Sequence, residues 1–347
     1  MGDCPKREWV NGMPPPIAVT DRMGSTLDAG ALDPTKETRN GALTSSRPTL
    51  SVIIVTYNSA AKLRPTLEAV MAQHHPNYEV ILYDNNSTDG TLAIARPFQA
   101  QGLKVIASPE NRGFSGGNND AVEASRGELL VLLNPDAVLR PGGLVEIERA
   151  FVQNPRMGIL GAKLLAPDGR TIMHCGGRIG MPAHTELYGR GEIDRGQWDE
   201  PMQVELVIGA LLVIPRSLWV QLGGFDEFFN PTYFEDTDLC YRCRRLGRPV
   251  VYWPRVCLIH SENVSQAYKS WRFFWAHHKG RIWFTAKNLP LWRLVFQAIP
   301  AEAAWFVSPR GAAGLRPMML RIYWMILKRF LARRILRLKP LQERRGV

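Results

Sequence analysis

Four short apolar runs alternate with segments of helical spacing in the first part of the chain, and this alternation restricts the fold more than any other feature. The runs are rich in Val, Ile and Leu and have the length of buried strands. They comprise residues 50–57, 78–83, 103–107 and 128–133. Strands that alternate with helices at this spacing form a mostly parallel sheet with helices on both faces. The sequence therefore predicts an α/β fold.

Polar residues follow two of these runs, at the edge where an open α/β sheet binds its ligands. Asp84 ends the second run, and Asn134-Pro135-Asp136 follows the fourth. A carboxylate at Asp136 can hold a divalent cation, which in turn holds phosphate groups. The same side chain can instead bond to the backbone of its own turn, as Asp often does. The residues alone leave both roles open.

Two common phosphate-binding signatures are missing. The chain has no G-x-x-x-x-G-K-[ST] segment, and no G-x-G-x-x-G segment follows a predicted strand. Their absence argues against a P-loop ATPase and against a dinucleotide-dependent redox enzyme. A sheet with acidic strand ends must bind its ligand in another way.

The pattern changes from about residue 157 onward. Residues 157–165 and 204–214 are predicted strands joined by a long Gly-rich polar segment, and residues 250–253 form a further short strand. The acidic run EDTD at 235–238 precedes a predicted helix that ends near residue 246. Carboxylates here stabilise a helix N-terminus. Alternatively, one of them takes a proton from an acceptor hydroxyl.

Three cysteines and a histidine raise the alternative of a structural zinc site. Cys240-x-x-Cys243 is followed, after thirteen residues, by Cys257-x-x-His260, which resembles a site with three thiolates and one imidazole. Against this, Cys240 and Cys243 fall on a predicted regular helix, and a chain of 347 residues does not need a metal to fold. The five cysteines are not spaced like a disulfide framework, so we expect a reducing cytoplasm.

The net charge of +11 is concentrated at the C-terminal end of the chain. Residues 310–347 carry eleven Lys and Arg against one acid, Glu343, whereas the rest of the chain is nearly neutral. Basic tails of this kind bind nucleic acid or anionic membranes. Trp, Leu, Ile and Met are interleaved with the charges here, which favours a membrane surface.

The same tail predicts a helix over residues 317–339. Six apolar residues recur every three or four positions, so they form an uncharged stripe on one face of this helix: Leu320, Trp324, Leu327, Leu331, Ile335 and Leu338. Five basic residues lie off this stripe: Lys328, Arg329, Arg333, Arg334 and Arg337. A basic amphipathic helix with Trp and Leu on one face lies in the headgroup region of anionic membranes. The alternative is a helical pair packed on the rest of the protein.

Seven segments in register resemble glycosyltransferase family 2, whose members are inverting, nucleotide-sugar-dependent enzymes of the GT-A fold. The resemblance covers about residues 49–288 and is most similar to the rhamnosyltransferase-type branch that builds bacterial surface glycans. Its carriers are SVIIVTYNS (51–59), VILYDNNSTDGT (80–91), NRGFSGGNN (111–119), LLNPDA (132–137), GGFDEFF (223–229), YFEDTDLCYR (233–242) and the histidine at 260.

The resemblance implies a role for each matched position. It makes Asp236 the catalytic base with Glu235 beside it, and it places a divalent metal, Mg or Mn, on Asp136 and His260. The usual first Asp of the family's D-x-D is Asn134 here, which leaves one charged ligand in that triplet. The implied nucleotide-sugar contacts are Thr56, Tyr57, Asn58, Asp84, Asn86, Arg112, Gly113, Asn118 and Asn134.

The implied reaction moves a sugar, with inversion, from a nucleotide-diphosphate donor to a hydroxyl of a lipid-linked or polysaccharide acceptor. The resemblance favours dTDP-L-rhamnose as donor, with a UDP-hexose as second choice. Two other functions remain open from the residues. One is a sugar nucleotidyltransferase, which is expected to carry a Gly-rich basic loop after the first strand. The other is a nucleic-acid-binding protein that uses the basic tail, which leaves the strand-end acids unexplained.

The expected organisation has three parts. Residues 1–48 form a disordered leader rich in Gly, Pro and polar residues. Residues 49–288 form a GT-A domain with a nucleotide-sugar half (49–156) and an acceptor half (157–288). Residues 289–347 form a helical, basic, membrane-associating extension. The N-terminal stretch lacks the charged start and following apolar run that mark a signal peptide. We therefore expect a peripheral protein on the cytoplasmic face of the cell membrane.

Overall fold

The computed structural model describes residues 49–180, 183–261, 270–308 and 314–338, with side chains to residue 332 in the last range. All described residues belong to one compact unit, Ser46–Val347. The predicted leader, 1–48, and the final residues of the basic tail, 339–347, lie outside the described residues.

A mixed sheet of ten strands forms the centre of this unit, in the order β10-β12-β6-β11-β4-β1-β2-β3, with β5 paired to β12 and β7 to β6. The predicted N-terminal strands are parallel to one another. They are β1 (Leu50–Thr56), β2 (Tyr78–Asp84), β3 (Lys104–Ala107) and β4 (Leu129–Leu133). The parallel strands and their helices confirm the predicted α/β fold class, and the antiparallel pairing of β11 (Leu211–Pro215) with β4 makes the whole sheet mixed.

The second half of the sheet differs from the prediction in two places. The predicted strand 204–214 is two strands, β10 (Met202–Val204) and β11, with a connecting segment between them. The predicted strand 250–253 is the start of a longer one, β12 (Val250–His260). The strand was predicted to end before Pro254, because proline has no backbone N–H to donate to a neighbouring strand. The pairing of β12 with β6 (Ile159–Leu165) shifts register between Trp253 and Cys257, around that proline.

The remaining strands are short, and all of them except β5 lie in the Gly-rich polar segment for which no strand was predicted. β5 (Ala137–Leu139) directly follows the Asn134–Asp136 triplet, and β7 (Ile172–His174) pairs with β6. A separate hairpin is formed by β8 (Gly177–Gly180) and β9 (His184–Leu187).

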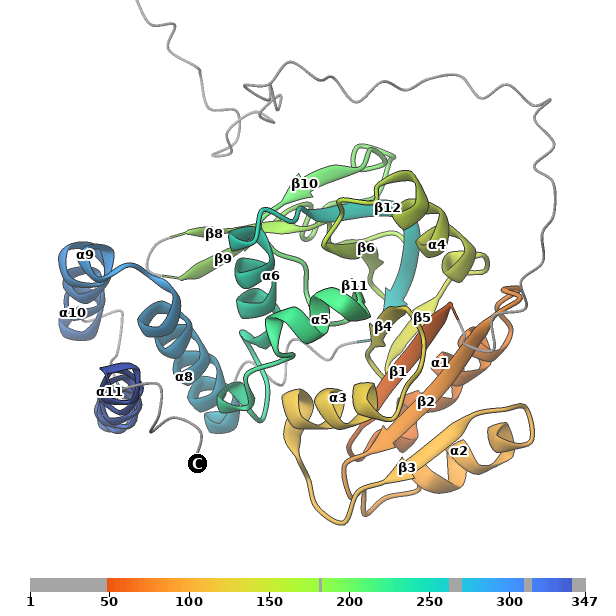
Figure 1. Cartoon of the computed structure of the whole chain (residues 1–347), viewed down its shortest axis with the longest axis horizontal. Helices are drawn as coiled ribbons and strands as arrows, with labels where there is room; N and C mark the ends of the chain where they lie inside the picture. The colour runs from red at the N-terminus through yellow and green to blue at the C-terminus, as the bar shows by residue number, and fades with distance from the viewer. Residues whose placement is uncertain (1–48, 181–182, 262–269, 309–313, 339–347) are drawn as a thin grey trace, which may run out of the picture. The chain divides into compact units, whose positions relative to one another are not determined.

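Helices cover both faces of the sheet (Figure 1). Alternate residues of β1 point to opposite faces: Val52 and Ile54 join one core, and Ile53 and Val55 join the other. The first core contains α1 (Ala60–Met71), α2 (Thr91–Gln99) and α4 (Gly143–Gln153). The second contains α3 (Gly113–Glu123), α5 (Arg216–Leu222) and α6 (Glu235–Arg245).

The C-terminal helices are blue in Figure 1, and side chains of α8, α10 and α11 share a third core with the short helix η1 (Glu227–Phe229). In this core, Met318, Met319, Ile322 and Ile326 of the last helix pack with Trp283. The helices are α8 (Trp271–Asn288), α9 (Leu291–Arg293), the π-helical η2 (Leu294–Ala298), α10 (Ile299–Val307) and α11 (Arg316–Leu338). None of the helices in the described ranges combines the length and the apolar character that crossing a bilayer requires.

Candidate active site

The carboxyl end of β2 holds a buried carboxylate. Asp84 accepts hydrogen bonds from the Thr56 hydroxyl at 3.0 Å, the Ser87 hydroxyl at 2.5 Å and the Ser87 N–H at 2.9 Å. Both carboxylate oxygens therefore bind the loop that follows β2, and Thr56 at the end of β1 is part of the same network. The structure brings these two predicted residues together, as expected from parallel neighbouring strands.

The loops after β1 and β2 are held against each other by Asn58. Its N–H donates to the Ser87 hydroxyl at 2.9 Å, and its side-chain oxygen accepts the Thr88 N–H at 2.9 Å. Asn58 and Asn86 have positive φ values of 50° and 59°, a region that Asn adopts more readily than most residues. Tyr57 is 53% exposed. The predicted contacts of these residues with a nucleotide stay predictions.

The start of the Gly-rich helix α3 is fixed by Asn85, for which no role was predicted from the sequence. Its side-chain oxygen accepts the Arg112 N–H at 3.1 Å, and its amide donates to the Gly113 carbonyl at 3.0 Å. Gly113 has a φ of 69°, and a Cβ there would lie 2.5 Å from the Asn230 side-chain oxygen. Glycine is thus required for two reasons: the positive φ disfavours any side chain, and a Cβ would clash with Asn230. The sequence did contain a signal for Asn85, because this residue directly follows the strand-end Asp84.

Two residues predicted to contact the nucleotide sugar have protein partners in this structure. The Arg112 guanidinium pairs with Asp120 at 3.2 Å and with Glu227 at 3.3 Å. The buried Asn118 donates its amide to the Phe114 carbonyl of its own helix at 2.9 Å. Their contact with a donor stays a prediction.

Asp136, His260 and Asn134 lie together, although His260 is far away in sequence. His260 Nε2 lies 3.1 Å from Asp136 Oδ1 and 3.5 Å from the Asn134 amide nitrogen. The antiparallel pairing of β5 with β12, with His260 opposite Ala137, produces this contact. Lys62 of α1 also reaches Asp136, at 3.4 Å, and donates to the Ser261 carbonyl at 2.6 Å. Lys62 gave no signal in the sequence, because it is a single Lys on a helix.

Burial raises the pKa of Asp136, but hydrogen bonding and positive charge from His260 and Lys62 outweigh burial and leave the pKa below its usual value. The carboxylate is therefore ionised in the neutral range. It forms the charged member of a small N,O donor set.

This donor set has the chemistry to hold a divalent cation. Asp136, His260 and Asn134 converge within hydrogen-bonding distances, whereas the described residues contain no group of three or more His, Cys, Asp or Glu side chains placed for a metal. A cation held here would need further oxygen ligands from outside this donor set, as Mg²⁺ and Mn²⁺ commonly have from phosphate and water. An imidazole ligand favours Mn²⁺ over Mg²⁺.

The alternative zinc site does not form among the described residues. Cys240 and Cys243 are buried in the core between α6 and the sheet. His260 is bonded to Asp136 instead. Burial raises the pKa of Cys243 to about 12, which opposes the thiolate form that zinc requires.

Glu235 and Asp236 begin α6 after two strained residues. Tyr233 and Phe234 have φ values of 81° and 74°, a costly conformation for aromatic residues that is typical of functional positions. Asp236 accepts the Gly209 N–H at 2.8 Å and the Thr237 N–H at 2.6 Å. Glu235 is buried and accepts one long hydrogen bond, 3.4 Å, from the Thr232 hydroxyl.

The two carboxyl groups differ in how well their ionised forms are stabilised. Burial raises the pKa of Glu235 well above its usual value, and the charge of Asp236 raises it further. Burial also raises the pKa of Asp236, but the N–H groups of Gly209 and Thr237 counteract this. The pKa of Asp236 is therefore raised less strongly than that of Glu235, which makes Asp236 the better base of the two.

A two-residue segment joins the two parts of the site. The Gly209 N–H donates to Asp236, and the adjacent Ala210 carbonyl accepts the Asn134 N–H at 3.0 Å. Since consecutive Cα atoms are about 3.8 Å apart, the start of α6 and the Asn134–Asp136 triplet face the same stretch of backbone. Gly209 lies in the connection that was predicted to be a continuous strand, so the sequence interpretation missed it.

The family model described as glycosyl transferase family 2 matches residues 51–204. An uncharacterized protein, y4gI, of Sinorhizobium fredii is 34% identical over 64% of this chain and 25% of its own length. The O-antigen biosynthesis protein RfbC of Myxococcus xanthus is 31% identical over 63% of this chain and 18% of its own length. This chain thus spans a quarter or less of these two relatives.

A third relative matches over nearly its whole length. It is the N-acetylglucosaminyl-diphospho-decaprenol L-rhamnosyltransferase of Mycobacterium tuberculosis, 28% identical over 78% of this chain and 92% of its own length. The similarity therefore extends beyond the segment that the family model matches.

Solved structures show the fold. GalNAc-T7, crystallised with UDP, GalNAc and Mn²⁺, superposes with a TM-score of 0.59 at 15% identity, over 80% of this chain and 55% of its own. S. aureus TarS 1–349 in complex with UDP-GlcNAc gives a TM-score of 0.52 at 16% identity, over 82% and 83% of the two chains. The mixed sheet with its flanking helices is the GT-A fold that the sequence predicted.

Proposed function

The chain belongs to glycosyl transferase family 2, and from this premise we propose that it is an inverting glycosyltransferase. It moves a sugar from a nucleotide-diphosphate donor to a hydroxyl of a glycan acceptor. The observation that supports this most directly is the Gly209–Ala210 segment, which holds an ionised carboxylate at Asp236 and the Asn134–Asp136 triplet against the same backbone. A base for the acceptor and a binding site for the diphosphate are thus neighbours.

In the proposed reaction, Asp236 takes the proton of the acceptor hydroxyl as that oxygen attacks the sugar. A neutral hydroxyl is a weak nucleophile, so the transfer needs a base in hydrogen-bonding reach. The Gly209 and Thr237 N–H groups keep the carboxylate oriented. Protonated Glu235 adds no second negative charge beside it. One displacement with one base inverts the anomeric centre.

The leaving diphosphate is held at the carboxyl edge of the sheet. Asp136 and His260, with Asn134, are the residues that would hold a divalent cation, which supplies charge neutralisation for the leaving diphosphate. The Lys62 ammonium lies 3.4 Å from Asp136 and is a further cationic group at the same point. Thr56, Asp84 and Asn85 fix the loops that would surround the nucleoside.

For the donor and acceptor, we propose dTDP-L-rhamnose and a lipid-linked diphosphate sugar in bacterial surface-glycan synthesis. The support is the relative named as an N-acetylglucosaminyl-diphospho-decaprenol L-rhamnosyltransferase, which is matched over 92% of its length. A UDP-hexose is the second donor to test. The sugar nucleotidyltransferase and nucleic-acid alternatives are disfavoured, because neither explains a base at Asp236.

We also propose a peripheral location on the cytoplasmic face of the membrane, beside such an acceptor. The predicted apolar stripe of α11 points away from the core: the side chains of Leu320, Trp324, Leu327 and Leu331 are 58%, 59%, 46% and 48% exposed. The buried face of the helix is the opposite one, so packing on the protein and contact with lipid coexist. Lys328 lies over the Trp324 ring at 4.9 Å, beside this stripe.

The test is transfer and hydrolysis with a panel of donors. Purified protein with Mn²⁺ is expected to release dTDP from dTDP-L-rhamnose faster than UDP from UDP-hexoses, and to form one product of inverted configuration with a lipid-diphosphate GlcNAc acceptor. Retention of configuration, or absence of hydrolysis with every nucleotide sugar, contradicts the proposal.

A further inference from the structure

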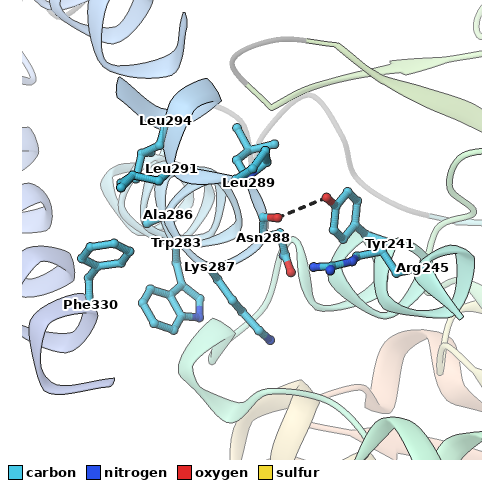
Figure 2. Close-up of a pocket in the computed structure, with 11 residues that line it drawn as sticks. Tyr241, Arg245, Trp283, Ala286, Lys287, Asn288, Leu289, Leu291, Leu294 and Phe330 are labelled. Atoms are coloured by element: carbon cyan, nitrogen blue, oxygen red, sulfur yellow. Dashed lines mark hydrogen bonds between the residues drawn. The ribbon is translucent and has the colours of Figure 1, made fainter. Parts of the chain in front are cut away.

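A pocket outside the catalytic site lies where α6 meets the C-terminal helices. Its cavity volume is about 480 Å³, within the usual range for small-ligand sites, about 300–1,000 Å³. In Figure 2, one side carries Leu291, Leu294 and Phe330, and the other carries Tyr241 and Arg245. The pocket thus has an apolar wall and a polar wall.

Its positive charge comes from one arginine of α6. The last turn of this helix contains three arginines. Arg242 pairs with Asp238 at 2.7 Å, and Arg244 pairs with Glu205 at 3.0 Å. Arg245 lines the pocket, and it makes no ion pair with any residue in the described part of the chain. An exposed guanidinium of this kind binds phosphate oxygens well.

The other cation of the pocket is already neutralised. Lys287 lies 2.9 Å from Asp226 and 2.9 Å from Asp238. Asn288 also donates to Asp238, at 2.8 Å, and its carbonyl accepts the Tyr241 hydroxyl at 3.1 Å. These residues form a rigid polar floor, so a bound anion is expected to take its ionic contact from Arg245.

The apolar wall continues into side chains on the protein surface. Leu291 lines the pocket and is 51% exposed, and its neighbours Trp292 and Phe296 are 53% and 75% exposed. Exposed aromatic and aliphatic side chains in series mark a surface for membrane or protein contact. Arg293, whose guanidinium lies 5.2 Å from the centre of the Trp292 ring, adds positive charge.

We propose that this pocket binds one anionic phospholipid of the bilayer. The phosphate lies on Arg245, and the first part of an acyl chain lies along Leu294 and Phe330 and leaves past Leu291. A ligand with one negative charge next to hydrocarbon matches a pocket with one unpaired cation next to an apolar wall. The inference rests on the proposed membrane association, but not on the proposed sugar transfer.

The pocket is separate from the catalytic centre. Asp236 and Arg245 are nine residues apart on α6, which places them roughly 13 Å apart along the axis and on opposite sides of the helix. Asp236 faces Gly209, whereas Arg245 faces α8 and α9 (Figure 2). A lipid here holds the enzyme to the membrane without entering the donor site.

Calorimetry on the full chain tests this with dihexanoyl-phosphatidylglycerol below its micelle concentration. We expect saturable binding at one site. Arg245→Gln removes the cation and is expected to weaken binding roughly tenfold or more, as loss of a charged hydrogen bond does. Ala286→Phe fills the pocket without changing its charge and is expected to weaken binding equally. Arg64→Gln on α1 is the control that loses the same charge elsewhere, and it is expected to bind like wild type.

Three results would overturn the proposal. One is equal weakening by Arg245→Gln and Arg64→Gln, because the effect is then one of net charge. Another is equal affinity for inorganic phosphate, because the acyl chain then contributes nothing. The third is farnesyl phosphate bound tenfold more tightly, which assigns the pocket to an isoprenoid carrier. Donor hydrolysis, measured in parallel, reports on the proposed function independently, since these variants do not alter the catalytic site.

Discussion

At the scale of single residues, Asp236 and Glu235 are adjacent but differ in chemistry. Asp236→Asn is expected to lower kcat by about 10²–10⁴, the usual effect of losing a general base, with donor affinity unchanged. Glu235→Gln is expected to cost less, because Glu235 is already neutral. Steady-state kinetics at saturating acceptor measure both. Near-normal turnover of the Asp236 variant contradicts its assignment as the base.

The same pair sets the acid side of the pH profile. Burial raises the pKa of Asp236, so activity falls as the pH decreases through this raised value and the base becomes protonated. If Glu235 holds the proton, Glu235→Gln leaves that limb of the kcat profile where it is in wild type. A limb displaced to lower pH in the Glu235 variant would show that Glu235 carries the charge instead.

Asp136 is expected to act through the diphosphate. Asp136→Asn keeps the shape of the side chain but removes its charge, so affinity for dTDP in the presence of Mn²⁺ is expected to fall roughly tenfold or more. Affinity for thymidine, which has no phosphate, is the internal control and is expected to stay unchanged. Titration calorimetry with and without Mn²⁺ measures this. Equal loss for both ligands indicates damage to the pocket rather than to cation binding.

Site residues that occupy a recognisable position in the sequence were predicted from it. Residues that only the tertiary fold brings to the site were not predicted. Asp84 ends one apolar strand, Asp136 closely follows another, and Asp236 lies in an acidic run at the start of a helix. Lys62 and Gly209 have no such signal. Each reaches the site because the chain brings α1 or the β10–β11 connection to it.

At the scale of elements, buried charges join α6, α8 and the loop before η1. Lys287 binds both Asp226 and Asp238, and Asp226 also accepts the Trp283 indole N–H at 3.2 Å. One basic residue of the tail, Arg329, points inward to Asp226 at 3.8 Å and lies over Phe228, rather than toward a membrane. The tail is therefore coupled to the segment that precedes the catalytic helix.

Asp226 gives this network a pH dependence. Burial raises its pKa, but Lys287 and the hydrogen bonds from Phe228 and Trp283 lower it to about 2. A depressed pKa stabilises the fold above the unfolded value, near 4, by about 2 kcal/mol, and this is lost as the pH falls toward 2. Asp226→Asn is expected to lose that stabilisation at pH 6 and to show a smaller decrease between pH 5 and 3. Urea unfolding across this range measures it, and parallel curves for both proteins would refute it.

The outward stripe of α11 is expected to govern vesicle binding. Replacing Leu320, Trp324 and Leu327 with Gln is expected to weaken binding to phosphatidylglycerol vesicles roughly tenfold or more, because apolar side chains no longer enter the interface. The melting temperature should hardly change, since these side chains are exposed. Val152→Gln on α4, at a site that is 72% exposed, is the matched control. Unchanged vesicle binding of the triple variant, measured by flotation, refutes the membrane role of the stripe.

At the scale of the whole molecule, α11 is part of the core as well as a surface. Met318, Met319, Ile322 and Ile326 pack with Trp283 and Phe284 of α8. Truncation after residue 308 is expected to expose that face and to lower the melting temperature by several degrees, as the loss of a few kcal/mol does in a domain of this size. Differential scanning calorimetry of the truncated chain and of the stripe variant compares their melting temperatures. The comparison distinguishes the role of the packed face of α11 from that of its exposed face. A truncated chain as stable as wild type would contradict the packing role.

The sequence by itself determined the local elements and their order. Apolar runs rich in Val, Ile and Leu dictated β1, β2 and β4, an acidic run marked the start of α6, and the spacing of apolar residues dictated α11, because these signals depend only on near neighbours. The tertiary structure decided what distant residues do. Pairing of β5 with β12 brought His260 to Asp136, and the β10–β11 connection brought Gly209 to Asp236. The tertiary structure also decided which of the two apolar faces of α11 is buried. Periodicity in the sequence identifies an apolar face, but it does not show what that face packs against.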